Sequence, residues 1–86
     1  MKNFNEIKNI DDNIIPELLK EVELKDISFA IRYSDDEVKD KFFSNMRKLD
    51  SDMVKEDIEF MGDIPKEKNL KAQEAIVAAI NKLTKD

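Results

Sequence analysis

The chain is 86 residues long, 41% hydrophobic and 41% charged, with a net charge of −5 and neither cysteine nor histidine. This length suits a single domain, residues 1–86, and the acidic balance disfavours nucleic acid and anionic membrane surfaces while it suits a basic protein partner. The missing cysteine and histidine exclude disulfides and remove the commonest transition-metal ligand. We therefore expect no cofactor.

Turn-forming residues are scarce, with one glycine and two prolines in the whole chain. Helices joined by short connections are therefore favoured over a strand-rich fold. No apolar run approaches the length of a membrane span, and Met1-Lys2-Asn3-Phe4 does not begin the apolar core of a signal peptide. We expect no direct membrane insertion and a cytoplasmic location.

The first half of the chain shows apolar residues at helical spacing. Residues 4–10 predict a short helix or helical turn, 13–22 a helix with Pro16 in its first turn, and 24–33 a third helix. The run from Ser34 to Glu37 is typical of a capping box, and it opens a fourth helix over 35–47. The side chains of that helix expected to face inward are Val38, Phe42, Phe43 and Met46.

Two longer helices follow. Asp50 or Ser51 is expected to cap a fifth helix that ends at Met61, where Gly62 supplies the position after the last turn. The last helix covers 66–85 and carries an aliphatic stripe, in which Gln73 is expected to be a hydrogen-bonded core amide.

Asp57 stands out on the fifth helix. At about 100° per residue, it falls in the middle of an apolar arc, and the opposite half of the helix is polar. The side chains of the arc are Leu49, Met53, Val54, Ile58, Phe60 and Met61. Asp57 is therefore either one half of a structural ion pair or cap, or a binding carboxylate held between hydrophobic neighbours.

Phe29 and Tyr33 lie off the main apolar stripe of the third helix. Either this helix is buried on two sides, or the two rings mark a patch that binds a partner.

No arrangement of residues predicts an enzyme. The acidic pairs Asp11-Asp12 and Asp35-Asp36 stand where helix caps belong. The run from Asp50 to Asp52 lacks the loop glycine and the final glutamate of a calcium-binding EF-hand, and one glycine cannot build a phosphate-binding loop.

Six short segments follow one another over nearly the whole chain. They are Met1-Lys2-Asn3-Phe4, Ile10-Asp11-Asp12, Leu18-Leu19-Lys20-Glu21-Val22, Lys41-Phe42 with Asn45-Met46, Lys55-Glu56-Asp57-Ile58 ending at Gly62, and Gln73-Glu74-Ala75-Ile76-Val77. In this order, they resemble the C-terminal domain of the flagellar motor switch protein FliG.

The resemblance implies an all-α, armadillo-like bundle of five to six helices, with a hinge-like N-terminal segment over 1–12. It also implies a switch-complex domain at the cytoplasmic face of the flagellar basal body, which meets the cytoplasmic loop of the stator protein MotA and neighbours such as FliM. Arg32 matches a basic ridge position of the family, and Glu56 and Asp57 match two acidic ones.

Two further ridge positions, usually basic in the family, are Leu49 and Pro65 here, and the adjacent Lys48 and Lys66 offer substitute charges. We call Arg32, Lys48, Glu56, Asp57 and Lys66 the charged ridge. The sequence thus predicts a non-enzymatic rotor domain that binds the stator through this ridge to transmit torque and switch direction. The alternative is a FliG-like helical adaptor that docks proteins around Phe29 and Tyr33 without generating torque.

Overall fold

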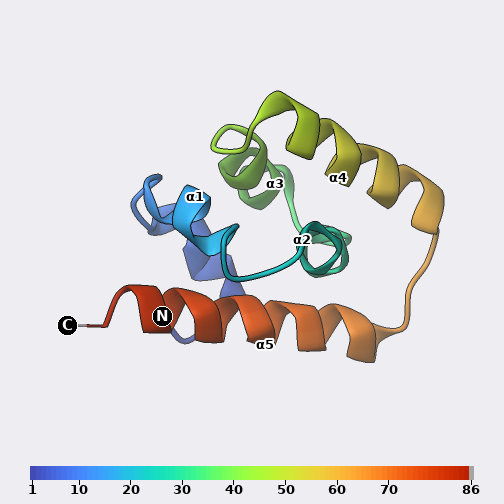
Figure 1. The fold of residues 1–86 in the computed structure, drawn as a ribbon. Helices are drawn as coiled ribbons and strands as arrows, with labels where there is room; N and C mark the ends of the chain where they lie inside the picture. The colour runs from blue at the N-terminus through green and yellow to red at the C-terminus, as the bar shows by residue number, and fades with distance from the viewer. Residues whose placement is uncertain (86) are drawn as a thin grey trace.

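The computed structural model describes residues 1–85, which form helices and connecting turns without a β-strand (Figure 1). The elements are the 3₁₀-helix η1 (Phe4–Asn9) and the α-helices α1 (Ile14–Leu18), α2 (Leu24–Ile31), α3 (Asp36–Phe43), α4 (Lys48–Met61) and α5 (Lys66–Leu83). The all-α, armadillo-like prediction with five to six helices is confirmed. Within these residues, no helix has both the length and the apolar character needed to cross a bilayer.

Helix α2 is the centre of the arrangement. In Figure 1, α5 runs along one side of the molecule and α4 along the opposite side, while α2 is seen end-on between them. Helix α2 packs against both long helices, and α1 and η1 also lie against α5. The two long helices are therefore positioned mainly through α2.

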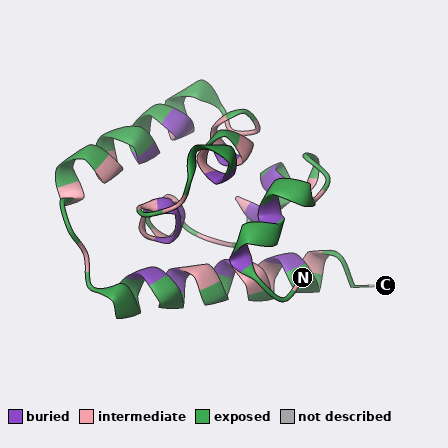
Figure 2. Ribbon diagram, turned by 180° about the vertical axis from the view of Figure 1, so that it is seen from behind, coloured by how far each residue is buried: buried purple, intermediate pink, exposed green. Residues whose placement is uncertain are grey.

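One apolar core joins these helices. In Figure 2, the buried residues, coloured purple, fall mainly on the sides of the helices that face one another. The largest fully buried side chains are Phe42, Ile7, Ile15, Leu18, Ile27, Ile31, Ile76, Ile80, Val38 and Val54. Phe4 stacks on Phe42 with ring centroids 6.3 Å apart. Val38 and Phe42 stand one turn apart on α3, which explains why both enter the same core.

Two of the inward-facing residues predicted for the fourth helix are only partly buried. The helix predicted over 35–47 ends at Phe43, because the chain turns there toward α4. Met46 therefore lies in the connecting turn, and Phe43 points about 100° away from the buried Phe42. Both side chains pack at the margin of the core.

Some predicted helix boundaries are also wrong. The helix predicted over 13–22 is regular only over Ile14–Leu18 and continues as turns. The N-cap of α3 is Asp35, whose carboxylate accepts a hydrogen bond from the Val38 backbone N–H at 3.0 Å, and Ser34 instead bonds backward to the carbonyl of Ala30. Helix α4 begins at Lys48, so Ser51 lies buried on its inner face instead of capping it.

Gly62 ends α4, as predicted. Its φ of +62° is a conformation that side-chain-bearing residues rarely adopt. The turn lets the chain leave α4 and start α5 on the far side of α2.

Two amides of α5 complete the last turn of α2. Asn69 Nδ2 donates to the carbonyls of Phe29 (2.6 Å) and Ala30 (3.2 Å), and Gln73 Nε2 donates to Ala30 at 3.0 Å. Carbonyls at a helix C-terminus have no partner within the helix, so these amides, together with the Ser34 hydroxyl at Ala30, supply the donors that the two carbonyls need. Gln73 is hydrogen-bonded as predicted, but it is only partly buried and so lies at the margin of the core instead of within it.

The N-terminal segment is tied to the same core. Phe4 and Ile7 of η1 are buried, and the Lys41 ammonium bonds to the Ile10 carbonyl and to the Asp12 carboxylate. The hydrogen bond from Lys41 lowers the pKa of Asp12. The hinge-like role of residues 1–12 remains a proposal.

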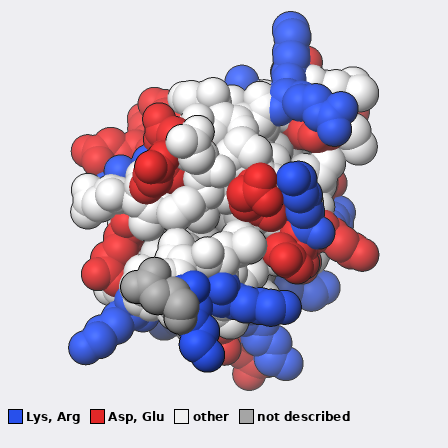
Figure 3. Space-filling view, turned by 60° about the vertical axis from the view of Figure 1, so that its left-hand side comes forward, with Lys and Arg blue, Asp and Glu red and all other residues white. Residues whose placement is uncertain are grey.

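Charges of both signs cover the surface. On the face in Figure 3, acidic and basic side chains are interspersed, with uncharged surface between them. A mixed surface of this kind gives no single-sign field on that face, so local arrangements of charge matter more than the net value.

We expect Phe42→Ala to lower the free energy of unfolding by roughly 3–5 kcal/mol, because it removes a fully buried ring and leaves a cavity. Urea unfolding followed by circular dichroism measures this loss. Phe43→Ala, which truncates a half-buried ring, is the matched control and should cost less. Equal losses for the two variants would show that the burial of Phe42 is not what stabilises the domain.

The capping box of η1 predicts a specific pH dependence. The backbone N–H groups of Asn3 and Lys2 donate to the Glu6 carboxylate at 2.7 Å and hold its pKa below the usual value. Because the folded-state pKa is depressed, the stability that Glu6 contributes is present above its unfolded pKa and is lost as the pH falls through the folded one.

Glu6→Gln should therefore lower the melting temperature at neutral pH and have a smaller effect at strongly acidic pH. Thermal melts of both proteins across the acid range give the comparison. A deficit that stays constant down to low pH would contradict this role of the Glu6 carboxylate.

Candidate functional site

Helix α4 is packed along one side only. Its buried residues, Ser51 and Val54, face α2 and α3, and Ile58 lies at the margin of the core. On the opposite side, Leu49 is 72%, Met53 53% and Phe60 78% exposed. The structure thus divides the apolar arc predicted for this helix, because the neighbouring helices cover only the half that contains Val54 and Ile58.

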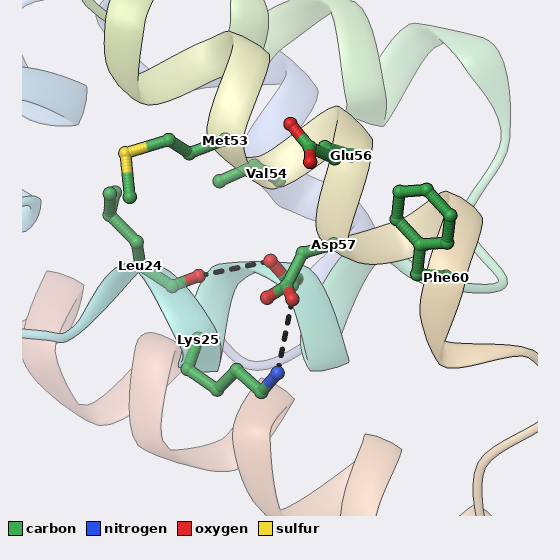
Figure 4. Close-up of a pocket in the computed structure, with 8 residues that line it drawn as sticks. Leu24, Lys25, Met53, Val54, Glu56, Asp57 and Phe60 are labelled. Carbon is green, nitrogen blue, oxygen red and sulfur yellow. Dashed lines mark hydrogen bonds and ion pairs between the residues drawn. The ribbon is translucent and has the colours of Figure 1, made fainter.

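Asp57 lies on the boundary between the two halves. Its carboxylate is 3.0 Å from the Lys25 ammonium of α2, and its side chain remains 32% exposed. Figure 4 shows Lys25 reaching across from α2 to this carboxylate. Asp57 therefore has an interhelical ion pair and also an edge open to solvent, so both roles considered for it are physically available.

A shallow groove of about 480 Å³ lies between α2 and α4 beside this pair. Leu24 and Lys25 line it from α2, and Met53, Asp57 and Phe60 line it from α4 (Figure 4). The groove combines apolar walls with two carboxylates, those of Glu56 and Asp57, and one ammonium group, that of Lys25. Exposed apolar side chains bordered by charged groups are typical of surfaces that contact other proteins.

Arg32 is bound at the C-terminal end of α4, more than one turn beyond Asp57. Its Nε donates to the Gly62 carbonyl at 2.7 Å, its Nη2 is 3.8 Å from the Asp63 carboxylate, and the guanidinium lies 4.9 Å from the Tyr33 ring centre. A cation at this position complements the negative end of the helix dipole. Arg32 is 24% exposed, so it anchors α4 and keeps only an edge at the surface.

Glu56 is fully at the surface. Among residues 1–85 it takes part in no ion pair. Glu56 is adjacent to Asp57 on α4. The charged ridge therefore has two neighbouring carboxylates, of which, within the described residues, Asp57 is paired with Lys25 and Glu56 is not in an ion pair.

The two lysines of the charged ridge lie on either side of Glu56 and Asp57 along the chain, one at the start of α4 and one at the start of α5. Lys48 is the first residue of α4 and pairs with Asp52 at 2.9 Å, a hydrogen bond that raises the pKa of Lys48 and lowers that of Asp52. Lys66 is the exposed first residue of α5, which follows the turn after α4. The structure therefore spreads the charged ridge along the whole of α4 instead of gathering it at one point.

The rings of Phe29 and Tyr33 are both engaged within the domain. The Lys25 and Lys68 ammonium groups lie 5.5 and 5.1 Å from the Phe29 ring centre. Tyr33 is 51% exposed, and its hydroxyl accepts from the Ile64 N–H at 2.9 Å and donates to the Ile64 carbonyl at 3.3 Å. Phe29 is therefore partly buried, and Tyr33 is the more exposed of the two rings.

Sequence reasoning missed Lys25 as the partner of Asp57, since the two are 32 positions apart and nothing in the sequence joins them. It also missed the exposure of Leu49, Met53 and Phe60. Their spacing was visible in the sequence, but it does not reveal which side of α4 the other helices cover.

The whole chain, residues 1–86, matches the family of the FliG C-terminal domain. It is 34% identical to the flagellar motor switch protein FliG of Thermotoga maritima and 35% identical to that of Borreliella burgdorferi, over 93% of this chain in each case. It covers 24% and 23% of those proteins, so the chain spans about a quarter of the length of its relatives.

Solved structures agree with this match. The structure of full-length FliG from Aquifex aeolicus superposes with a TM-score of 0.89 at 34% identity, over 96% of this chain and 26% of that one. A crystal structure of Helicobacter pylori FliG gives a TM-score of 0.90 at 29% identity, over 96% of this chain and 37% of that one. Because its sequence matches the family over its whole length and its helices superpose on those of solved FliG structures, the chain belongs to the FliG C-terminal domain family of the flagellar motor switch.

Proposed function

We propose that this chain acts as a rotor-side domain of the flagellar motor switch and binds the cytoplasmic loop of the stator protein MotA through the charged ridge. The observation that carries the proposal is the one-sided packing of α4, which fixes the helix and leaves its charged outer surface open. In this role the domain has no catalytic step. It transmits torque and changes rotational direction within a complex that includes neighbours such as FliM, at the cytoplasmic face of the basal body.

The charge of α4 supports a basic partner. Its carboxylates outnumber its ammonium groups by five to two: Asp50, Asp52, Glu56, Asp57 and Glu59 against Lys48 and Lys55. Exposed charges of this kind steer a partner and select it by sign more than they add affinity. They act over about 8–10 Å at physiological ionic strength, so the contact should weaken as salt is added.

Rigid support of the acidic pair matters as much as its charge. Asp57 is held by Lys25, and the end of α4 is held by Arg32 on the Gly62 carbonyl. A partner that exerts force on Glu56 and Asp57 therefore also exerts force on α2, and the hydrogen bond from Asn69 passes that force to α5. Force applied to the charged ridge would reach the rest of the domain through these contacts.

We expect the double reversal Glu56→Lys and Asp57→Lys to abolish stator-dependent rotation, because it places two positive charges where a basic loop should bind. Tethered-cell rotation measures this in a strain whose only copy of the chain carries the variant. Opposite reversals on the stator loop should restore part of the rotation. Normal rotation in the variant would contradict the ridge proposal and favour the adaptor alternative around Phe29 and Tyr33.

Loss of the Asp57–Lys25 ion pair needs its own control. An exposed pair of this kind is worth at most about 1 kcal/mol, so the fold should survive the double reversal. Adding Lys25→Glu rebuilds the pair with its charges exchanged. If the triple variant regains both rotation and thermal stability, Asp57 acts as a structural partner of Lys25. If the triple variant is stable but still does not rotate, Asp57 has a binding role.

A further inference from the structure

The exposed side of α4 carries a regular pattern that charge alone does not explain. Leu49, Met53, Glu56 and Phe60 follow one another at spacings of four, three and four residues, and they fall within an arc of about 60° on the helix. This is the spacing of the a and d positions of a coiled coil. We call these four residues the seam.

The seam is open in this structure. Leu49, Met53 and Phe60 are three of the five large hydrophobic side chains that the described residues expose, the others being Tyr33 and Leu70. The fold does not use the seam, because α4 meets its own core through Ser51, Val54 and Ile58 on the other side. A concentrated exposed apolar strip of this kind marks an interaction surface.

Acidic residues fill every position that flanks the seam. Asp50 and Asp57 lie on one side of it and Asp52 and Glu59 on the other, at the e and g positions through which paired helices select each other by charge. A second copy of this chain would set carboxylates against carboxylates on both sides. The complementary surface is a helix with an apolar face and basic residues on both flanks.

We propose that the seam binds lengthwise an amphipathic helix of another protein, one with apolar a and d residues, lysine or arginine at its flanking positions, and a basic residue opposite Glu56. This proposal rests on the function proposed above, because it takes the outer surface of α4 as the partner-binding surface. Glu56 is the one charged residue within the seam, so it would fix the register of the two helices at some cost in affinity.

The surroundings of the seam fit such a helix. The groove of about 480 Å³ between α2 and α4 adjoins the seam through Met53 and Phe60, and it can take side chains from one flank of the bound helix. The side chains of Lys25 and Lys48, whose ammonium groups pair with Asp57 and Asp52, are 54% and 89% exposed. They can move into solvent with little loss when basic residues of the partner arrive.

A synthetic helical peptide tests the proposal. It repeats a heptad with leucine at a and d and lysine at e and g, where the lysines also prevent the peptide from pairing with itself. We expect this peptide to bind the chain, as measured by titration calorimetry and by shifts of the α4 amide resonances. One control peptide carries glutamate at e and g, and another keeps the lysines but has serine at a and d; neither should bind comparably.

Variants of the chain locate the contact. The triple substitution Leu49→Gln, Met53→Gln and Phe60→Gln should weaken binding of the leucine–lysine peptide by at least about tenfold and leave the melting temperature nearly unchanged, since all three side chains are exposed. Leu70→Gln, which alters an exposed leucine on α5, is the matched control and should bind normally. Glu56→Leu should tighten binding of the leucine–lysine peptide, because it replaces the one charged residue of the seam, which faces leucine in this peptide.

Other results would overturn the proposal. Equal binding of the serine peptide would mean that charge alone acts, and normal binding by the triple variant would mean that the seam takes no part. Dimerisation of the chain alone, lost in the triple variant, would assign the seam to a second copy. Rotation that survives the triple variant but not the reversal of Glu56 and Asp57 would reject the seam and keep the function proposed above.

Discussion

The last turn of α2 is the junction on which the rest of the domain depends. Helix ends leave carbonyl groups without partners, and a buried unpaired carbonyl costs about 1–3 kcal/mol. Here the carbonyls of Phe29 and Ala30 accept hydrogen bonds from the Asn69 amide of α5. From the same turn, Arg32 reaches the Gly62 carbonyl at the end of α4. One short helix therefore fixes both long ones.

This arrangement explains why α4 can serve as a surface. The helix is held by its inner face and at its C-terminal end, so nothing in the described part of the domain has to cover its outer side. The inner face is small and apolar, which suffices because Val54 enters a core that six helical segments share. The side of α4 that stabilises the fold and the side proposed to bind a partner are thus opposite sides of the same helix.

Charge and apolar area contribute different things on that surface. Exposed ion pairs such as Lys48–Asp52 add little stability and are screened by salt, so under the proposed function the carboxylates would mainly select a partner by the sign of its charge. The exposed rings and aliphatic chains of Leu49, Met53 and Phe60 are the groups that can supply affinity by leaving water.

The sequence by itself determined the class of fold, because its apolar residues recur at helical spacing and its turn residues are few. It also identified Phe42 as core, Gly62 as the end of a helix, and the segments that carry the family resemblance. Local signals do this well, since a helix stop or a buried stripe depends mostly on neighbouring residues.

Helix lengths and the two sides of α4 came only from packing. The sequence placed Leu49, Met53, Val54 and Ile58 on one apolar arc, and only the positions of α2 and α3 decide that Val54 is buried while Leu49 is exposed. The ion pair of Asp57 with Lys25 likewise joins residues that the chain separates and the tertiary fold brings together. Contacts between helices decide that Asp57 forms an ion pair and that Glu56 is exposed to solvent, and no pattern along a single helix contains that information.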